Sequence, residues 1–350
     1  MKRYLRYLIW LIAFFCLEFV VVALFNLAID PFAAFGSPMI SGVNQLKLEQ
    51  QAHVRLFKAI AITRLQPKTI LLGSSRTDLG LNPDHQVFAN KSPVYNLGVP
   101  GVNMYEVRRY FEHALQNQPE IKQVVLGIDF LMFNQFRPEK PDFSERRLNL
   151  KRIGLADALA TTFSLDAVTS SWETIQASKK DRKNQAYSSL GMRNEKYFLR
   201  YGLPKKSIVE GFKFNLGRSI IDPEIYYNYA LSEEQINDFK TVVNTCKKNN
   251  LPLKVFISPS HATQWKAIEL SGLWDEFEQW KQEIVKITSV WDFSGYNSVT
   301  TEPISDKMKN YLDNSHYSKA VGNLVLNRIF QVQEELIPAD FGVLINSQNV

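Results

Sequence analysis

The stretch ILLGSSRTDLG, residues 70–80, joins an apolar run to a polar loop. The apolar residues 70–72 are typical of a buried strand, and Gly73 marks the point where the chain leaves that strand. Two hydroxyls, Ser74 and Ser75, follow at once. They form either an ordinary turn or, because ligands bind at the carboxyl ends of strands in open α/β sheets, the position of a nucleophile.

The regions around this stretch repeat the same alternation of strand and helix. Patterns of helical spacing lie between the apolar runs, and Ser232 with Gln235 forms a capping-box signature for one of them. We expect strands at 69–73, 93–98, 122–128, 251–258 and 289–294, and helices at 103–118, 232–249 and 273–287. Buried strands alternating with helices predict an α/β fold with a parallel sheet flanked by helices.

Composition restricts the class of protein. The 350 residues are 45% hydrophobic and 22% charged, which excludes a disordered chain. The net charge is +6, but no nucleic-acid-binding motif is present. The two cysteines, Cys16 and Cys246, exclude a disulfide framework and a CxxC metal site. We find no metal, nucleotide or dinucleotide motif, so no cofactor is expected.

The N-terminus predicts a membrane anchor. Residues 8–29 form an apolar run of 22 residues with a single charge, Glu18, and this length is enough to span a bilayer as a helix. Lys2, Arg3 and Arg6 precede it, so we expect a cytoplasmic N-terminus and an extracytoplasmic (periplasmic) remainder, attached to the inner membrane by a single pass. The run is longer than the apolar core of a cleaved signal peptide.

The expected organisation has three parts. Residues 1–30 are the cytoplasmic tip and anchor, 31–64 a linker and helix, and 65–350 the α/β domain. Within that domain, residues 135–230 interrupt the alternation, and residues 137–218 carry 17 Lys+Arg against 9 Asp+Glu, a net charge of +8. This insertion is either a solvated elaboration or a cap that faces an anionic polymer or lipid head groups.

The segment YLDNSHYSKAVG, residues 311–322, supplies what a serine nucleophile needs. Asp313 lies three residues before His316, a spacing that lets the carboxylate bind imidazole Nδ1–H and leaves Nε2 as a base toward Ser75. YNLGVPG, residues 95–101, follows the second strand and contains Asn96, Gly98 and Gly101. The amides of Gly101 and Ser75 are candidate donors to an oxyanion.

These blocks resemble the SGNH (GDSL-type) hydrolase superfamily. The usual Gly-Asp-Ser block matches residues 73–75, the second block matches 96–101, and the Asp-x-x-His block with its following glycine matches Asp313, His316 and Gly322. The resemblance implies a flavodoxin-like SGNH sheet with Ser75 as nucleophile. It also implies that Asn96, Gly98 and Gly101 belong to the oxyanion and substrate-binding region.

The third block departs from the family pattern. It usually reads Gly-x-Asn-Asp, and here Asp129 occupies the position of the asparagine donor. An ionised carboxylate cannot donate to an oxyanion, so Asp129 is protonated by burial, has another role, or is replaced by another group.

Two further residues are candidates for the site. Arg76 either binds an anionic substrate or pairs with a carboxylate such as Asp78. His261 follows the fourth expected strand, where it can line the site.

An anchor, a Gly-Ser-Ser block and a large insertion are most similar to the membrane-anchored branch that acylates envelope polymers, which includes the teichoic acid D-alanylation and alginate O-acetylation proteins. The expected function is therefore an acyltransferase or esterase acting on ester-linked acyl groups of a polysaccharide or other envelope polymer. The resemblance implies a membrane-bound partner that exports acyl groups. The alternatives are an ester hydrolase without a partner and a non-catalytic polymer-binding protein with a degenerate SGNH fold.

Overall fold

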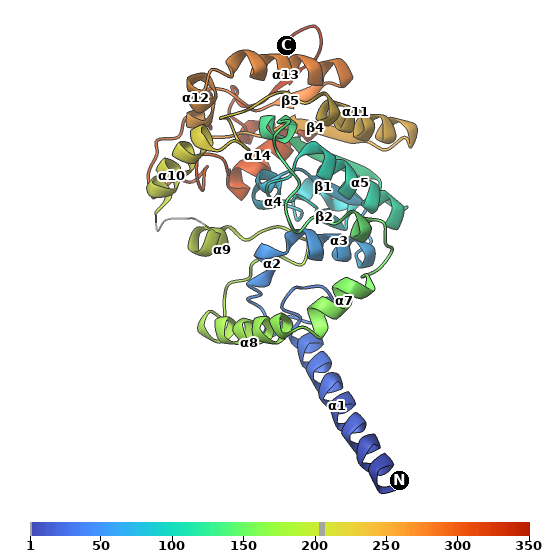
Figure 1. Ribbon diagram of the computed structural model, residues 1–350. Helices are drawn as coiled ribbons and strands as arrows, with labels where there is room; N and C mark the ends of the chain where they lie inside the picture. Colours follow the sequence, from blue (N-terminus) through green and yellow to red (C-terminus); the bar gives the residue numbers. More distant parts are fainter. Residues whose placement is uncertain (1, 203–206) are drawn as a thin grey trace.

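A six-stranded sheet forms the centre of the protein (Figure 1). The computed structural model describes residues 2–202 and 207–350. The strands are β1 (Thr69–Leu72), β2 (Val94–Asn96), β3 (Gln123–Ile128), β4 (Leu253–Ile257), β5 (Val290–Asp292) and β6 (Val343–Ile345). Their order is β2-β1-β3-β4-β5-β6, and every pair is parallel except β5 with β6. The five expected strands and the parallel α/β sheet are confirmed, whereas the antiparallel edge strand β6 was not anticipated.

Alternating strand residues divide the core into two layers. Ile70 and Leu72 face a large cluster formed with α3 (Val54–Arg64), α5 (Met104–Asn117), α11 (Glu233–Lys248) and α13 (Trp274–Ile287). Leu71 faces the opposite cluster, which includes α14 (Lys319–Phe330). Because all of these strand residues are buried, the strands consist of continuous apolar runs, as expected for a parallel sheet covered on both faces.

Short elements connect these layers. They are α2 (Glu49–Ala52), α4 (Ser75–Gly80), η1 (Gln86–Lys91), η2 (Phe130–Phe133), α12 (Ala262–Leu270) and η4 (Glu334–Leu336). Helix α3, which lies in the expected linker region, packs against α5 and is mostly buried, so it is part of the core.

The insertion is mostly helical. It contains α6 (Glu145–Leu148), α7 (Leu155–Thr162), α8 (Leu165–Lys180), α9 (Glu195–Tyr197), η3 (Phe198–Gly202) and α10 (Ile208–Ile221). Helices α7 and α8 pack against α1, whereas α10 packs against α12 of the α/β domain. The insertion therefore reaches two separate regions of the protein.

Helix α1 (Lys2–Ile29) extends away from the domain (Figure 1). Residues 3–29 are long and apolar enough to cross a membrane, with a mean hydropathy of 2.8 over the most apolar window. Most side chains before residue 21 are exposed, and only the last turns pack against the domain. The expected apolar N-terminal helix is confirmed.

Candidate active site

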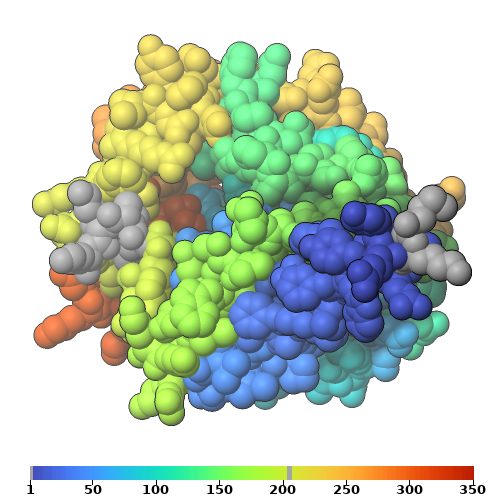
Figure 2. Space-filling model, turned by 60° about the horizontal axis from the view of Figure 1, so that its bottom comes forward, coloured from blue at the N-terminus to red at the C-terminus, as the bar shows by residue number. Residues whose placement is uncertain are grey.

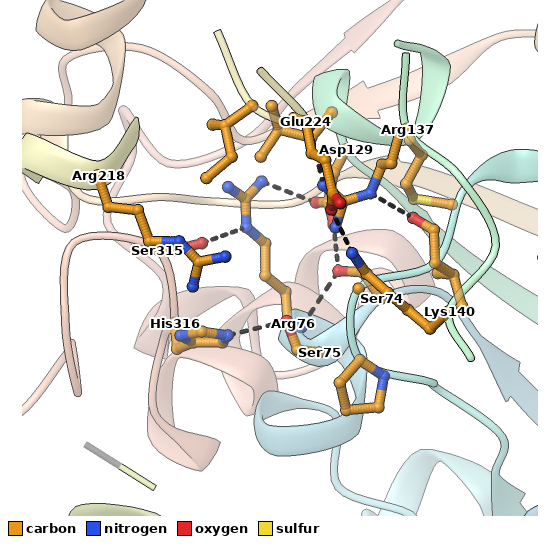
Figure 3. Close-up of a pocket in the computed structure, with 16 residues that line it drawn as sticks. Ser74, Ser75, Arg76, Asp129, Arg137, Lys140, Arg218, Glu224, Ser315 and His316 are labelled. Carbon is orange, nitrogen blue, oxygen red and sulfur yellow. Dashed lines mark hydrogen bonds and ion pairs between the residues drawn. The ribbon is translucent and has the colours of Figure 1, made fainter. Parts of the chain in front are cut away.

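The two serines after β1 have different environments. Ser74 is the N-cap of α4, and its Oγ accepts a hydrogen bond from the Arg76 amide at 3.2 Å. Ser75 is the first residue of α4. Its Oγ lies 2.8 Å from His316 Nε2 (Figure 3). The first hydroxyl therefore caps the helix, and the second is paired with a base.

His316 connects Ser75 to a buried carboxylate. Its Nδ1 lies 2.8 Å from Asp313 Oδ2 and 2.9 Å from Oδ1. The backbone amides of Ser315 and His316 both donate to Asp313 Oδ1, and Asn215 Nδ2 donates to Oδ2 at 3.1 Å. The structure therefore brings together the three residues that the sequence predicted as a catalytic triad.

The surroundings of Asp313 favour its ionised form. Burial by itself raises the pKa of this carboxyl, because the side chain is only 1% exposed. The charge of His316, its hydrogen bond and the two backbone amides outweigh burial and lower the pKa below its ordinary value. A carboxylate in this position stabilises an imidazolium on His316.

Two backbone amides beside the triad are unused. In the described part of the chain, neither the Ser75 amide nor the Gly101 amide donates a hydrogen bond to the protein. Gly101 has φ +71, a left-handed conformation that favours glycine. Both residues line the same cavity as His316. These amides are therefore available to an oxyanion that develops next to Ser75 Oγ.

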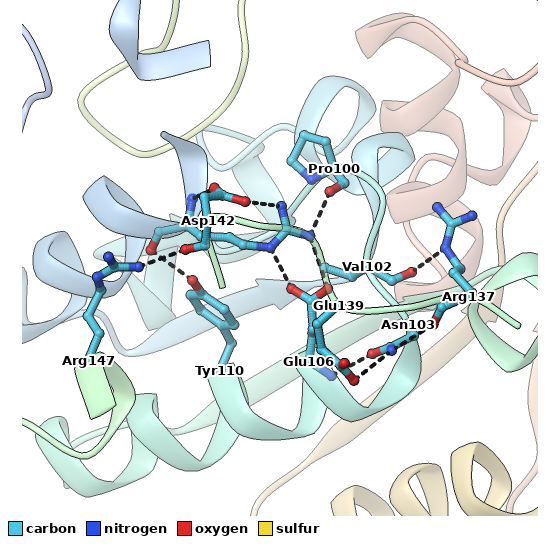
Figure 4. Close-up of polar contacts among 10 residues, drawn as sticks. Pro100, Val102, Asn103, Glu106, Tyr110, Arg137, Glu139, Asp142 and Arg147 are labelled. Carbon is cyan, nitrogen blue, oxygen red and sulfur yellow. Dashed lines mark hydrogen bonds and ion pairs between the residues drawn. The ribbon is translucent and has the colours of Figure 1, made fainter. Parts of the chain in front are cut away.

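A buried ion pair fixes the loop that contains Gly101. Arg55 pairs with Glu106 and donates from Nη2 to the Pro100 carbonyl at 3.0 Å. Figure 4 shows the neighbouring contacts of this loop, in which Asn103 donates to the carbonyl of Arg137. The loop conformation is thus set by side chains on α3 and α5.

Asn96 and Gly98 lie behind the cavity. The amide group of Asn96 is fully buried and donates to the carbonyls of Thr77 and Leu81, while its Oδ1 accepts from the Gly98 amide. Neither residue lines the cavity. Through these hydrogen bonds they join the end of β2 to the backbone of α4, the helix that begins with Ser75.

Asp129 is bound to two neighbours. It accepts hydrogen bonds from the Ser74 hydroxyl and from Arg76 Nη1, the latter at 2.8 Å (Figure 3). Of the two alternatives for Arg76, the structure shows pairing with a carboxylate. The partner is Asp129 and not Asp78, which pairs with the buried Lys58. Asp129 and Arg76 both line the cavity, and together they form part of its wall.

The insertion contributes part of the wall of this cavity, whose volume is about 370 Å³. Its lining includes residues that sequence reasoning missed, namely Arg137, Lys140, Arg218, Glu224, Ile225 and Ser315. Four cations, including Arg76, outnumber two carboxylates in the lining. Lys140 pairs with Glu224, and Arg218 pairs with Asp222 at 2.9 Å. In the sequence, only the basic composition of residues 137–218 indicated that the cavity lining would have an excess of cations.

Arg137 is the least neutralised of these cations. Its Nε donates to the Val102 carbonyl at 3.0 Å, and Nη1 donates to the Glu224 carbonyl at 3.3 Å. Within residues 2–202 and 207–350 it forms no ion pair with a carboxylate. Its positive charge therefore remains available to a ligand in the cavity.

His261 lies outside the cavity lining. Its Nδ1 accepts from the Thr263 amide at the start of α12, and its Nε2 lies 2.8 Å from the Glu302 carbonyl. Burial lowers its pKa, which favours the neutral ring. The geometry therefore gives His261 a capping position rather than a place among the site residues.

Gly322 brings the two halves of the triad together. A Cβ at this position would lie 1.8 Å from the carbonyl oxygen of Gly80, so α14 contacts the end of α4 backbone to backbone. Helix α4 begins with Ser75, and α14 begins three residues after His316. This close packing holds together the two helices next to Ser75 and His316.

No family model matches this chain, and no curated protein matches its sequence. Among the residues that the structure describes, no group of three or more His, Cys, Asp or Glu side chains is arranged to hold a metal ion.

Proposed function

We propose that this protein is a serine acyltransferase or esterase that works through an acyl-enzyme on Ser75. The observation that carries the proposal is the continuous hydrogen-bonded chain from Ser75 Oγ to His316 Nε2, and from His316 Nδ1 to Asp313, with each link at 2.8 Å. A serine hydroxyl is a weak nucleophile without such a base.

The proposed reaction has two halves. Ser75 Oγ attacks the carbonyl carbon of an ester and His316 Nε2 takes its proton, while the amides of Ser75 and Gly101 bind the oxyanion. Collapse of the tetrahedral intermediate breaks the bond to the leaving oxygen, which receives the proton from His316. In the second half, His316 deprotonates an acceptor hydroxyl or water, and that oxygen attacks the carbonyl carbon of the acyl-enzyme. The bond from this carbon to Ser75 Oγ then breaks, and His316 returns the proton to Oγ.

The motif resemblance to the SGNH superfamily supports the same chemistry, and the parallel α/β sheet is consistent with it. We assign Asp129 a different role from the usual asparagine donor. Its carboxylate accepts from Ser74 and Arg76, so it positions these groups while the backbone amides serve the oxyanion.

The charge of the cavity supports an anionic substrate. The lining contains four cationic side chains and two carboxylates, and the insertion supplies three of the four cations. We therefore propose that the acceptor or donor is an acidic envelope polymer or polysaccharide. We also propose that the insertion limits the access of water to the acyl-enzyme, which favours transfer over hydrolysis.

The proposed location follows from α1 and the motif resemblance. Helix α1 anchors the protein in the inner membrane with its N-terminus in the cytoplasm, because the basic residues precede the span. The catalytic domain then lies in the periplasm, and a membrane-bound partner exports the acyl groups that it uses.

Active-site labelling tests the proposal. The full chain in detergent is incubated with a fluorophosphonate, and the modified residue is identified by peptide mass spectrometry. We expect an adduct on Ser75 that is lost in Ser75→Ala and retained in Ser74→Ala, because Ser74 has no histidine partner in the described structure. If the folded protein forms no adduct, the assignment of Ser75 as the nucleophile is contradicted, and a non-catalytic binding protein is favoured.

Small esters and acceptors separate transfer from hydrolysis. An acetyl ester is supplied with and without a soluble acidic oligosaccharide, and the acetylated products are measured. Acetylated oligosaccharide that is absent with Ser75→Ala indicates transfer. Release of acetate alone, at a rate that the oligosaccharide does not change, indicates a simple hydrolase.

A further inference from the structure

Helix α8 has its large apolar side chains on the outside. Its buried residues are small and mostly polar, namely Ala167, Ser170, Ser171, Thr174 and Ser178. Leu165 is 86% exposed and Trp172 is 58% exposed. Val168 and Ile175, half-buried, continue the same stripe at spacings of three and four residues. A helix packed against a protein core usually has the opposite arrangement.

Helix α7 presents a second stripe next to the first. Leu155, Leu159 and the following Phe163 recur every four residues and are 76%, 46% and 42% exposed. The ring of Phe163 lies 6.3 Å from that of Phe19, an exposed residue of α1. The exposed apolar surface of α7 therefore continues into the apolar surface of the proposed span.

Polar contacts hold this helix pair in place. Asn26 near the end of α1 donates to the Thr162 carbonyl at 2.8 Å and accepts from the Ser171 hydroxyl at 2.7 Å. The Leu46 amide donates to Ser178 Oγ at 3.0 Å. Because these contacts use the small-residue face of α8, the outward position of Leu165 and Trp172 is built into the fold.

The position of the pair is consistent with a membrane surface. Figure 2 views the molecule from the side on which α1 emerges, and α7 and α8 lie beside α1 on that face. Exposed basic residues flank both ends of the pair. Lys151 and Arg152 precede α7, Lys179 and Lys180 are the last two residues of α8, and Arg182 follows that helix. Cations beside an apolar stripe are attracted to anionic lipid head groups.

We propose that α7 and α8 form an interfacial membrane-docking surface that inserts Leu155, Leu159, Phe163, Leu165 and Trp172 into the lipid around α1. The proposal rests on the anchoring role proposed for α1. An amphipathic helix of this kind lies in the interface plane and buries its apolar side chains ~5–10 Å into the head-group and acyl boundary. The docking surface is a second contact with the bilayer, in addition to α1. Two contacts fix the orientation of the catalytic domain above the membrane.

Depth-dependent quenching tests the docking surface in the full chain. Cys16 and Cys246 are replaced by alanine, and a polarity-sensitive fluorophore is attached to Trp172→Cys in nanodiscs that contain only this protein and phospholipid. We expect quenching by a phospholipid nitroxide placed near the head group. We also expect a Stern–Volmer constant for aqueous iodide roughly threefold or more below that of the Trp274→Cys control. Trp274 is 36% exposed and is the first residue of α13, a helix that lies at the opposite end of the domain from α1 (Figure 1).

Two further label positions make the result decisive. Thr169→Cys, an exposed position on the polar flank of α8, should remain open to iodide. Ile12→Cys on α1 reports anchoring itself and should be quenched by lipid nitroxides. If Ile12 is lipid-quenched but Trp172 is as open to iodide as Trp274, the docking surface is wrong, although anchoring stands. If Ile12 is not lipid-quenched, the anchoring proposal fails and this inference fails with it.

Discussion

The carboxylate of Asp129 forms an ion pair with Arg76, with 2.8 Å between Oδ1 and Nη1. Both side chains are at least 94% buried, and Arg76 also donates from Nε to Ser315 Oγ at 3.1 Å. Ser315 directly precedes His316 in the chain. The pair therefore links the loop after β3, the start of α4 and the segment that contains the base of the triad.

Breaking this pair should destabilise the protein more than removing it entirely. Asp129→Asn leaves a buried guanidinium without its charge partner, so we expect a loss of about 3 kcal/mol in the free energy of unfolding. The double variant Arg76→Met with Asp129→Leu should lose less than Asp129→Asn alone. Urea unfolding in detergent measures the loss for each variant, and a double variant that loses as much as Asp129→Asn would contradict the prediction.

Asp313→Asn should reduce kcat for an activated ester by a factor on the order of 10⁴, because an amide cannot stabilise the His316 imidazolium or hold its tautomer. The variant should keep the fluorophosphonate site, although labelling should be slower. Steady-state kinetics with circular dichroism as a fold control checks this. A change of less than about tenfold would remove Asp313 from the triad.

Asp313 should also contribute to acid sensitivity. Because its pKa in the folded protein is lowered, the ionised group stabilises the fold above its unfolded pKa of about 4, and this contribution is lost as pH falls through the folded pKa. The difference in unfolding free energy between wild type and Asp313→Asn should shrink as the pH falls below about 4. A difference that stays the same below about pH 4 would contradict a lowered pKa for Asp313.

Gly322→Ala should distort the site, because its Cβ would meet the Gly80 carbonyl oxygen at 1.8 Å. We expect a loss of about 1–3 kcal/mol in stability and a lower kcat, since α14 must move relative to α4. Gly217→Ala is the matched control, because a Cβ there meets nothing within 4 Å on the exposed side of α10. Thermal unfolding and ester kinetics should separate the two variants; equal behaviour would refute close packing at Gly322.

Arg137→Gln should weaken the use of an anionic acceptor without affecting a neutral ester. We expect KM for an acidic oligosaccharide to rise roughly tenfold through loss of a charge-assisted hydrogen bond. The kcat/KM for a small neutral ester should change little. Arg200→Gln, which removes an exposed arginine paired with Asp181 outside the cavity lining, is the control. An equal rise in KM for both variants would exclude a specific anion contact at Arg137.

Local signals in the sequence predicted much of this architecture. The five parallel strands and the helices at 103–118, 232–249 and 273–287 agree with the structure to within a few residues, because apolar runs and helical spacing report burial directly. The pairing of Asp313 with His316 was also predictable, since both lie in one short segment. Strand β6 (Val343–Ile345) was not, because its antiparallel pairing with β5 lies outside the alternation of parallel strands and helices.

Tertiary structure decided the contacts between distant segments. Asp129 follows β3, yet its partners Ser74 and Arg76 follow β1, so its role depends on strand order. The placement of Arg137 and Arg218 in the cavity, and of α7 and α8 beside α1, depends on how the insertion crosses the domain. The sequence by itself determined the apolar N-terminal helix, the strands and the pairing of Asp313 with His316, because these depend on neighbouring residues. Which charge meets which partner, and which apolar side chains remain outside, depends on packing between segments that are distant in the chain. The separation is 53 residues for Arg76 and Asp129 and 145 residues for Asn26 and Ser171.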